Sequence, residues 1–302
     1  MTPHEVGLGL QSDKQVDEYE ALARRAEAAG FDVISVFHDL FFQPAIFPLL
    51  AMARVTERVR LGPAALNAQT LHPVEIAGQA AALDLASGGR AYLGLVTGSW
   101  LDQLGLDEHR PLTRLREAVE IVRRLLAGDR TGFAGERFTL APCAGLAYEP
   151  LRREMPLLIG TWRPRAASFA REVADEVKIG GCANPDMVAL MRSWLGDDGP
   201  RIVVGAVTVV DEDGDRAREH ARSQVRMYLD VVADLDPTLE LRPGEPAPLE
   251  KFVLAGTPEQ VAEQAVALYS AGAYRVDFGT PQGLTTRGGV DLLCDRVLPL
   301  LR

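Results

Sequence analysis

Residue types and patterns that are scarce in this sequence already exclude several classes of protein. Cysteine occurs only three times in 302 residues. Such a low, odd number argues against a disulfide framework or a zinc site and is typical of a reducing cytoplasm. No apolar run approaches the ~18 residues of a membrane-spanning helix, and the N-terminus lacks the basic segment and apolar core of a signal peptide. We therefore expect a cytoplasmic protein that does not enter a membrane.

Basic charge and recognisable catalytic motifs are also limited. Lysine occurs only at positions 14, 178 and 251, and the formal net charge of −10 argues against nonspecific nucleic-acid binding. The pattern H-x-H, the pattern H-x-x-x-H and paired carboxylates are all missing where expected strands end, so we expect no metal site. No G-x-S-x-G elbow supports acyl transfer.

Apolar segments typical of strands alternate with segments of helical periodicity along the chain. The expected strands are uniformly apolar, as in a parallel sheet that helices cover. They span residues 6–10, 33–37, 58–66, 91–98, 156–161, 175–181, 201–210 and 274–280. Eight strand–helix units predict an α/β fold, a (β/α)8 TIM barrel, with residues 1–302 as one domain. A doubly wound sheet is the alternative, but "GLGLQSD" lacks the G-x-G-x-x-G pattern.

Two regions depart from this alternation. Residues 128–155 contain Gly, Pro and two short β-like pieces, "GFAG" and "RFTL", which predict an excursion from the barrel. Pro63 lies inside the third expected strand, where it removes a backbone donor, so we expect a bend or bulge there. Near the C-terminus, one long helix is expected over residues 213–233.

The stretch "IGTWRPRAASFA" carries the clearest binding signal. After a strand that ends at Ile159, the loop and helix start comprise Gly160, Thr161, Trp162, Arg163 and Pro164. Free N–H groups and the positive end of the dipole at a helix N-terminus bind phosphate. Arg163 would add a charge-assisted contact, and Gly180 and Gly181 follow the adjacent strand. An ordinary barrel loop with a solvent-facing arginine is the alternative.

Several stretches together resemble the bacterial luciferase-like oxidoreductases. They are "ARRAEAAGFD", "ARVTERVRLGPAALNAQTLHPVEIAGQAAALDLASGGRAYLGLVTGS", "PLLIGTWRPRAASFAREVADEVKIGG" and "LAGTPEQVAEQAVALYSAGAYRVDFGTPQG". The second stretch is the most specific, because it combines T-E-R-[VI]-x-L-G, H-P and L-D-x-x-S-x-G-R-x-x-L-G in order. The branch that the chain most resembles uses the deazaflavin coenzyme F420, as methylenetetrahydromethanopterin reductase does.

The resemblance implies a cofactor ring at the C-terminal face of the barrel. A non-prolyl cis peptide bond between Ala64 and Ala65 would lie behind the ring, and Asn67 would reach its polar edge. The 160–164 loop would hold the phosphate through backbone N–H groups. The residues that the resemblance assigns to the cofactor are Ala64, Ala65, Asn67, Thr97, Gly98, Ser99, Gly160, Thr161, Trp162, Arg163, Pro164, Gly180 and Gly181.

The adjacent His38 and Asp39, at the end of the second expected strand, are the candidate catalytic residues. His38 would act as general acid or base, because an unperturbed imidazole titrates near neutrality. Asp39 would orient it or hold a cofactor hydroxyl. A strand-end histidine and a helix-capping aspartate are the structural alternatives. F420-using relatives usually carry Asp before His, so the order here is inverted and leaves open which residue faces the ring.

We therefore expect an F420-dependent oxidoreductase that transfers a hydride between reduced deazaflavin and a small organic substrate. An FMN-dependent luciferase-like monooxygenase, a non-catalytic flavin-binding barrel and a phosphosugar isomerase or aldolase are the alternatives. Phe, Leu and Pro in the loops at 40–45, 100–110, 128–155 and 236–250 favour a substrate with an apolar body. The resemblance also implies a homodimer, formed through the helices expected at 45–56 and 75–86.

Overall fold

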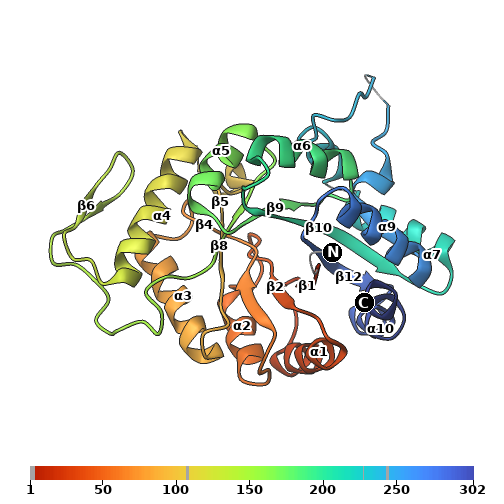
Figure 1. Cartoon of the computed structure of the whole chain (residues 1–302), viewed down its shortest axis with the longest axis horizontal. Helices are drawn as coiled ribbons and strands as arrows, with labels where there is room; N and C mark the ends of the chain where they lie inside the picture. Colours follow the sequence, from red (N-terminus) through yellow and green to blue (C-terminus); the bar gives the residue numbers. More distant parts are fainter. Residues whose placement is uncertain (1–3, 107–108, 227, 243–244) are drawn as a thin grey trace.

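Parallel strands form the ring that the alternating sequence predicts. The computed structural model describes residues 4–106, 109–226, 228–242 and 245–302. The strands follow the order β3-β2-β1-β12-β10-β9-β8-β5-β4, and a bridge between Leu61 of β3 and Ala91, just before β5, closes the ring. The (β/α)8 barrel is therefore confirmed, with its helices around the strands (Figure 1). The ring strands are β1 (Glu5–Leu10), β2 (Val33–Val36), β3 (Arg60–Pro63), β4 (Leu66–Asn67), β5 (Leu93–Val96), β8 (Leu157–Gly160), β9 (Glu176–Gly180), β10 (Arg201–Val210) and β12 (Arg275–Gly283).

The third barrel strand is divided into two pieces. Its first piece, β3, pairs with β2, and its second piece, β4, pairs with β5 on the other side. Between them, a cis peptide bond joins Ala64 to Ala65. The bend expected from Pro63 and the cis bond implied by the resemblance are therefore both found at this point.

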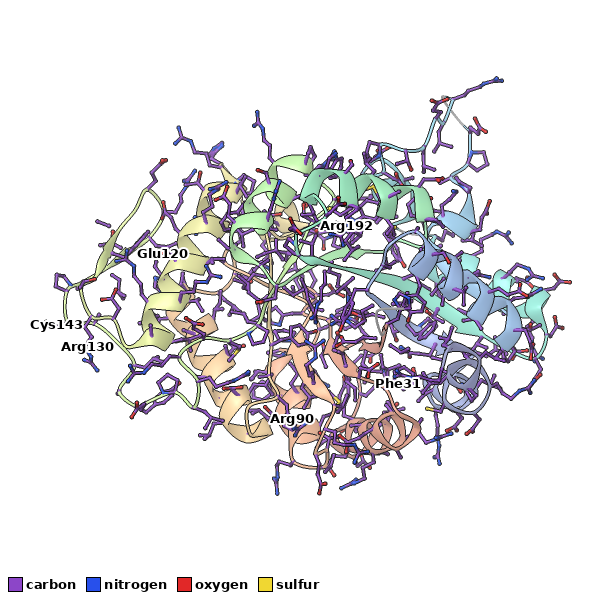
Figure 2. All side chains as sticks on the ribbon, in the orientation of Figure 1. Phe31, Arg90, Glu120, Arg130, Cys143 and Arg192 are labelled. Carbon is purple, nitrogen blue, oxygen red and sulfur yellow. The ribbon has the colours of Figure 1, made fainter. Side chains whose placement is uncertain are left out.

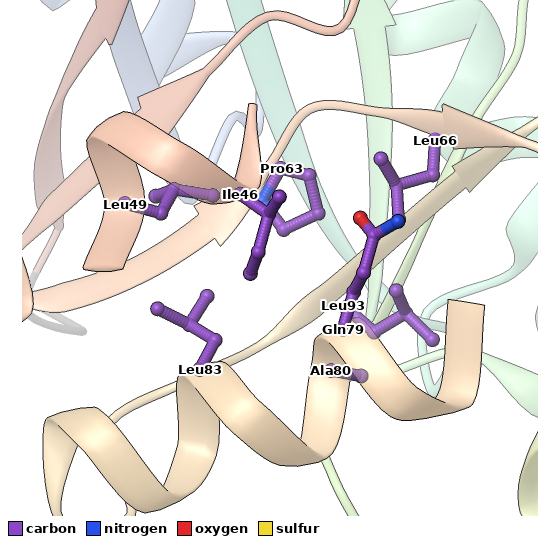
Figure 3. Close-up of a pocket in the computed structure, with 8 residues that line it drawn as sticks. All are labelled: Ile46, Leu49, Pro63, Leu66, Gln79, Ala80, Leu83 and Leu93. Carbon is purple, nitrogen blue, oxygen red and sulfur yellow. The ribbon is translucent and has the colours of Figure 1, made fainter. Parts of the chain in front are cut away.

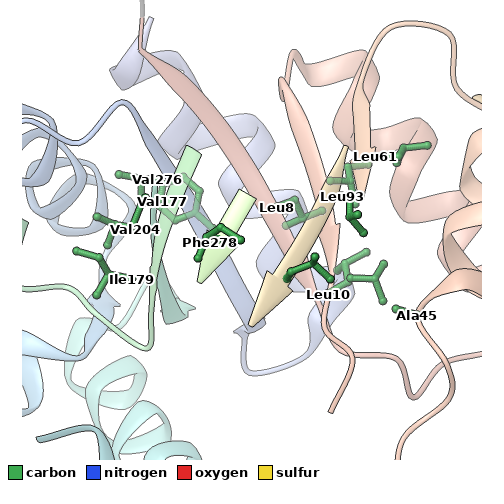
Figure 4. Packing of buried hydrophobic residues seen from close by; sticks show 14 of the residues in the cluster. Leu8, Leu10, Ala45, Leu61, Leu93, Val177, Ile179, Val204, Val276 and Phe278 are labelled. Carbon is green, nitrogen blue, oxygen red and sulfur yellow. The ribbon is translucent and has the colours of Figure 1, made fainter. Parts of the chain in front are cut away.

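Helices cover the outer side of the ring. They are α1 (Val16–Ala29), α2 (Ile46–Ala53), α3 (Pro73–Ser87), α4 (Pro111–Ala127), α5 (Pro164–Val173), α6 (Pro185–Leu195), α7 (Gly214–Val225), α8 (Leu229–Ala233), α9 (Pro258–Ser270), α10 (Thr286–Leu292) and α11 (Leu298–Leu301). Proline at the first turn starts several of them, where no backbone donor is lost. Outward-facing strand residues such as Leu8, Val177 and Val276 pack beneath these helices in one apolar cluster (Figure 4).

Three C-terminal features differ from the sequence expectation. The helix expected over 213–233 is two helices, α7 and α8, so that prediction was wrong. An additional strand, β11 (Val253–Gly256), pairs with the long β10 outside the ring. It is as short as β2, β5 and β8, which were recognised, but the eight strand–helix units of a barrel leave no place for a further strand. The last helix contains a π-helical turn at Leu293–Val297, and short 3-10 turns occur at Leu101–Leu104 and Leu249–Lys251.

The excursion at 128–155 is a hairpin held against the barrel helices (Figure 1). Its strands, β6 (Phe133–Ala134) and β7 (Thr139–Leu140), pair antiparallel. On α4, the Glu117 carboxylate accepts the backbone N–H groups of Glu136, Arg137 and Phe138 at 2.7, 2.9 and 2.9 Å. Burial would raise the pKa of Glu117, but these three hydrogen bonds lower it below its ordinary value. The hairpin is therefore tied to α4 through a single carboxylate.

The barrel interior carries charge that uniformly apolar strands do not predict. Arg275 is fully buried, and it contacts Asp277 on its own strand and Glu176 on β9. Lys178 on β9 forms an ion pair with Asp277 at 2.6 Å. These residues point inward from strands whose outward-facing residues are apolar. The expectation of uniformly apolar strands was therefore wrong for β9 and β12.

Candidate active site

The C-terminal opening of the barrel, where Phe37, Asn67, Gly98 and Gly180 follow or end their strands, is called the mouth below. Phe37, directly after β2, forms its floor. Its backbone N–H donates to Leu10 at 2.9 Å, and its carbonyl accepts the Ser12 hydroxyl at 3.0 Å. A Cβ on Gly9 would lie 2.8 Å from Phe37 Cζ, so glycine is needed where the ring crosses β1. The ring is partly exposed, and Lys178 Nζ lies 5.7 Å from its centroid. The floor therefore has solvent on one side and a buried cation on the other.

His38, the next residue, turns away from the barrel axis toward the start of α2. Its Nδ1 accepts the backbone N–H of Ala45 at 3.2 Å. Burial lowers the pKa of His38 below its usual range, and the nearby Asp39 only partly opposes this effect. The imidazole is therefore neutral at pH 7, with its proton on Nε2 because Nδ1 is the acceptor.

Asp39 stays at the mouth, next to the end of the first strand. Its side chain is exposed to solvent, yet desolvation by surrounding protein raises the pKa of its carboxyl, against the effects of Gln11 and His38. Gln11 is only 8% exposed, and within the described residues its Nε2 has no hydrogen-bond partner that meets normal geometry. The carboxyl group of the inverted His-Asp pair is thus the one that lies beside β1.

The ends of the third and fourth strands meet at Asn67 and Gly98. Asn67 Oδ1 accepts the backbone N–H groups of Gln69 and Thr70 and the Thr70 hydroxyl, each at 3.1 Å. Gly98 has a φ of +100°, which favours glycine, and a Cβ there would lie 3.4 Å from Asn67 Cγ. Thr97 is half-buried and Ser99 is exposed. The Asn67 carbonyl oxygen therefore holds its own loop, and its amide nitrogen is the group available to a ligand.

The fifth and sixth strand ends are joined by Trp162. Its indole Nε1 donates to the carbonyl of Gly180 at 2.8 Å, and the side chain is only 8% exposed. Arg163 precedes α5 at the N-cap position and provides no side-chain cap, while its own N–H donates to the Thr161 hydroxyl at 2.9 Å. The first N–H groups of α5 thus have no side-chain acceptor, and Gly180 leaves open space beside them. This arrangement suits an anionic group.

The structure thus places the predicted residues around one mouth, where their side chains make different contacts. Pro164 begins α5 and Gly181, with a φ of +72°, follows β9. Gln11 follows the first expected strand, at the catalytic end of the barrel, whereas sequence reasoning did not assign Phe37, Lys178 or Asp277 to the site. The only signal for the two charged residues was their place inside the apolar stretches "DEVKIGG" and "YRVDFGT".

Metal ligands and disulfides do not contribute to the described part of this site. Within the described residues, no three His, Cys, Asp or Glu side chains gather as metal ligands would. Cys143 is exposed in the excursion, far from the mouth, whereas Cys182 and Cys294 are buried, and all three are free thiols (Figure 2). Across the described ranges, no helix has the length and apolar character that crossing a membrane requires.

A small apolar pocket lies behind the third strand, outside the mouth. It is lined by residues of α2, α3, β3, β4 and β5, among them Ile46, Pro63 and Leu83 (Figure 3). Gln79 points into it from α3, and its Oε1 has no partner among the described residues. The pocket lacks the titratable groups of the mouth, so the mouth is the candidate active site.

The chain is similar to known proteins along most of its length. The family model described as luciferase-like monooxygenase matches residues 1–275. The 5,10-methylenetetrahydromethanopterin reductase of Archaeoglobus fulgidus is 28% identical over 98% of this chain and 99% of its own length. An F420-dependent glucose-6-phosphate dehydrogenase of Nakamurella multipartita is 26% identical over 100% of this chain and 98% of its own length.

Solved structures show the same fold. The coenzyme F420 dependent tetrahydromethanopterin reductase from Methanopyrus kandleri superimposes with a TM-score of 0.88 at 23% identity, over 100% of both chains. An F420-dependent secondary alcohol dehydrogenase superimposes with a TM-score of 0.81 at 18% identity, over 100% of both chains. The family match covers most of the sequence, and the barrel with its cis Ala64–Ala65 bond is the fold that the sequence resemblance implied. The chain belongs to the luciferase-like monooxygenase family.

Proposed function

We propose that this protein is an F420-dependent oxidoreductase that transfers a hydride between the deazaflavin and a small organic substrate. The observation that carries the proposal is the uncapped N-terminus of α5, with Arg163 beside it and the open Gly180 next to it. This cradle suits a phosphate-bearing cofactor. Relatives that align over nearly the whole chain are named as F420-dependent enzymes, which supports F420 over FMN.

The remaining cofactor roles follow from the positions around the mouth. The Ala64–Ala65 segment would lie behind the ring, and the Asn67 amide nitrogen would reach the ring's polar edge. Gly98, with Thr97 and Ser99 on either side, would let the backbone approach the chain between ring and phosphate. The bound deazaflavin would supply the hydride chemistry, and the protein would orient it and exclude competing reactions.

Proton transfer is assigned to the pair that follows Phe37. His38 is neutral with its proton on Nε2, from which it can donate a hydrogen bond to a group that gains negative charge. To act as general acid it would first take up a second proton at Nδ1 and release the Ala45 N–H. Asp39, beside Gln11, would position substrate or cofactor hydroxyls. The exposed side chains of Phe41, Phe42 and Trp100 extend from the loops after β2 and β5, and they support a substrate with an apolar body.

Titration with the two cofactors tests the proposal directly. Purified protein is titrated with F420 and with FMN while fluorescence is followed, and we expect tight binding of F420. The F420 absorbance then reports turnover with glucose 6-phosphate, with secondary alcohols and, for reduced F420, with methylenetetrahydromethanopterin. Tight FMN binding without a response to F420 would favour the monooxygenase. F420 binding without turnover of any substrate would favour a non-catalytic barrel.

We also propose a cytoplasmic homodimer with one domain per chain. All three cysteines are free thiols, which supports a location in the reducing cytoplasm. On α2, Phe47 is 62% exposed, and on α3 Leu85 is 67% exposed. Gly78 lies one heptad before Leu85, and a Cβ on it would meet no atom within 4 Å. This face of small and apolar residues suits close helix packing.

Sedimentation at micromolar concentration tests the dimer. Gly78→Arg should give a monomer, because a long charged side chain cannot be buried against a second copy. Val266→Arg is the matched control, since Val266 is 48% exposed on the distant α9 and should leave the dimer intact. A wild-type monomer would overturn the proposed assembly.

A further inference from the structure

A buried ion pair lies directly below the floor of the candidate active site. Lys178 Nζ and Asp277 Oδ2 are 2.6 Å apart, and the two side chains are 7% and 1% exposed. The same ammonium lies 5.7 Å from the centroid of the Phe37 ring. The cation therefore contacts a carboxylate on one side and the aromatic floor of the mouth on the other.

Glycines on neighbouring strands make room for this pair. A Cβ on Gly7 of β1 would lie 1.8 Å from Asp277 Oδ1, and a Cβ on Gly205 of β10 would lie 2.6 Å from Lys178 Cε. Burying two charges carries a large desolvation penalty, and apolar side chains of similar volume fill such space at lower cost. The pair therefore occupies a space shaped for it, in a position where packing alone would favour apolar residues.

The pair has a defined direction relative to the mouth. Arg275 Nε donates to Asp277 Oδ1 at 2.9 Å from the N-terminal side of the barrel, and Ser35 Oγ donates to Oδ2 at 3.4 Å. Desolvation would raise the pKa of Asp277, but Arg275 and Lys178 hold it below its usual range, so the carboxylate is charged at neutral pH. The positive end of the pair thus faces Phe37, and the negative end faces the barrel interior.

We propose that the Lys178–Asp277 pair acts electrostatically through the Phe37 floor to favour the hydride-loaded form of a ring bound in the mouth. The proposal rests on the proposed function. Hydride transfer adds one negative charge to the acceptor ring until a proton follows, and a cation below the floor attracts that charge. Because the Lys178 side chain is buried, its attraction for a nearby charge is stronger than that of an exposed lysine. Lys178 would attract the charge that develops on the ring, and it neither forms nor breaks a bond.

Opposite changes to the two charges test the proposal. The dissociation constants of oxidised and reduced F420 are measured separately, and their ratio reports the redox preference of the site. Lys178→Met removes the cation but keeps the side chain's length, and it should weaken reduced F420 about threefold or more relative to oxidised F420. Asp277→Asn leaves the cation unbalanced and should shift the ratio in the opposite direction. If the pair were purely structural, the two variants would shift the ratio of the dissociation constants in the same direction, or would leave it unchanged.

Controls separate this effect from loss of packing. Tyr92→Phe removes a neutral hydroxyl that lies 2.7 Å from Ser35 Oγ in the same interior network. It should lower the melting temperature without changing the affinity ratio. If Asp277→Asn does not fold, the double variant Lys178→Met/Asp277→Asn removes the whole pair and should give a ratio closer to wild type than Lys178→Met alone. An unchanged ratio in Lys178→Met overturns the inference, whereas wild-type protein that does not bind F420 overturns the proposed function.

Discussion

The backbone N–H of Ala45 donates a hydrogen bond to Nδ1 of His38 at 3.2 Å, so the start of α2 sets the orientation of the candidate proton-transfer residue. Nδ1 is occupied as an acceptor, and Nε2 is the nitrogen left for chemistry. The residue order His38–Asp39 therefore places the imidazole toward α2 and the carboxyl toward β1.

Replacing His38 by asparagine should abolish proton transfer while preserving this hydrogen bond. Asparagine offers an acceptor to Ala45 but has no group equivalent to Nε2. We expect turnover to fall by about 100-fold or more, with F420 affinity unchanged. His72→Asn is the matched control, because His72 Nδ1 also accepts a backbone N–H, from Val74 at 3.2 Å, but caps α3 and packs against Phe138 of the hairpin. Equal losses in both variants would remove His38 from the mechanism.

The pH dependence of turnover should show the lowered pKa of His38. Burial lowers the pKa of His38, so the imidazole stays neutral at pH values below its ordinary pKa of ~6.5. If turnover needs neutral His38, the acid limb of the rate profile should lie below pH ~6.5. The folded state binds this proton less readily than the unfolded state, so the associated stability is complete above the unfolded pKa. It is lost as pH falls through the lowered folded pKa. Stopped-flow rates and thermal unfolding across pH 5–8 measure both effects.

Asp39→Asn should slightly stabilise the protein at neutral pH while lowering its activity. Desolvation raises the pKa of this carboxyl, so the folded state binds the proton more tightly than the unfolded state. The associated stability is present below the unfolded pKa of ~3.9 and lost as pH rises through the folded pKa. The gain in melting temperature should therefore shrink as pH falls toward ~4. Asp197→Asn, on an exposed loop, should show no such gain.

Arg163→Gln should weaken F420 binding by about 10- to 100-fold, because one charge-assisted hydrogen bond contributes roughly 1.5–3 kcal/mol. The loss should be smaller at high salt, where charges are screened. Arg171→Gln, at the other end of α5, is the matched control and should bind F420 as the wild type does. Equal affinity of all three proteins would show that Arg163 faces solvent only.

Glu117→Gln should loosen the hairpin at 128–155. Gln offers one carbonyl oxygen in place of the carboxylate that accepts three backbone N–H groups. We expect a loss of about 1–3 kcal/mol in unfolding free energy and faster amide exchange at residues 136–138. Because the pKa of Glu117 is lowered, its contribution is complete above ~4.3 and lost as pH falls through the folded pKa. Glu120→Gln, whose partner Arg124 lies on the same helix, should leave this exchange unchanged.

Gly7→Ala should severely destabilise the barrel. The added methyl group would displace Asp277 and leave buried charges unpaired, which costs about 3–5 kcal/mol. Gly145→Ala is the matched control, because Gly145 is exposed and the atoms nearest the same added methyl group belong to the exposed Arg130 side chain, at 3.2 Å, so the stability should stay close to that of the wild type. Urea unfolding measures both. Similar stabilities would show that the barrel interior readjusts around the extra carbon.

Sequence patterns predicted those features that depend on local periodicity or on a specific motif. The ring strands and the excursion at 128–155 are in this group, and the cis bond between Ala64 and Ala65 was implied by the family resemblance. The direction of His38 was not predictable, because it depends on where α2 begins relative to the β2 loop. Lys178 and Asp277 were hidden for a different reason: strands with apolar outer faces give an apolar pattern even where their inner faces are charged. The apolar segment of β11 was not assigned to a strand, because eight strand–helix units already complete a barrel.

The charged barrel interior also restricts how this sequence can change over evolution. Gly7 and Gly205 are small because Asp277 and Lys178 are charged and large, so neither side of the arrangement can be exchanged alone. Acquiring a larger residue at either glycine requires losing a charge on the neighbouring strand at the same time. Related sequences should therefore vary at these four positions as a set, and a chain that retains the pair should also retain both glycines.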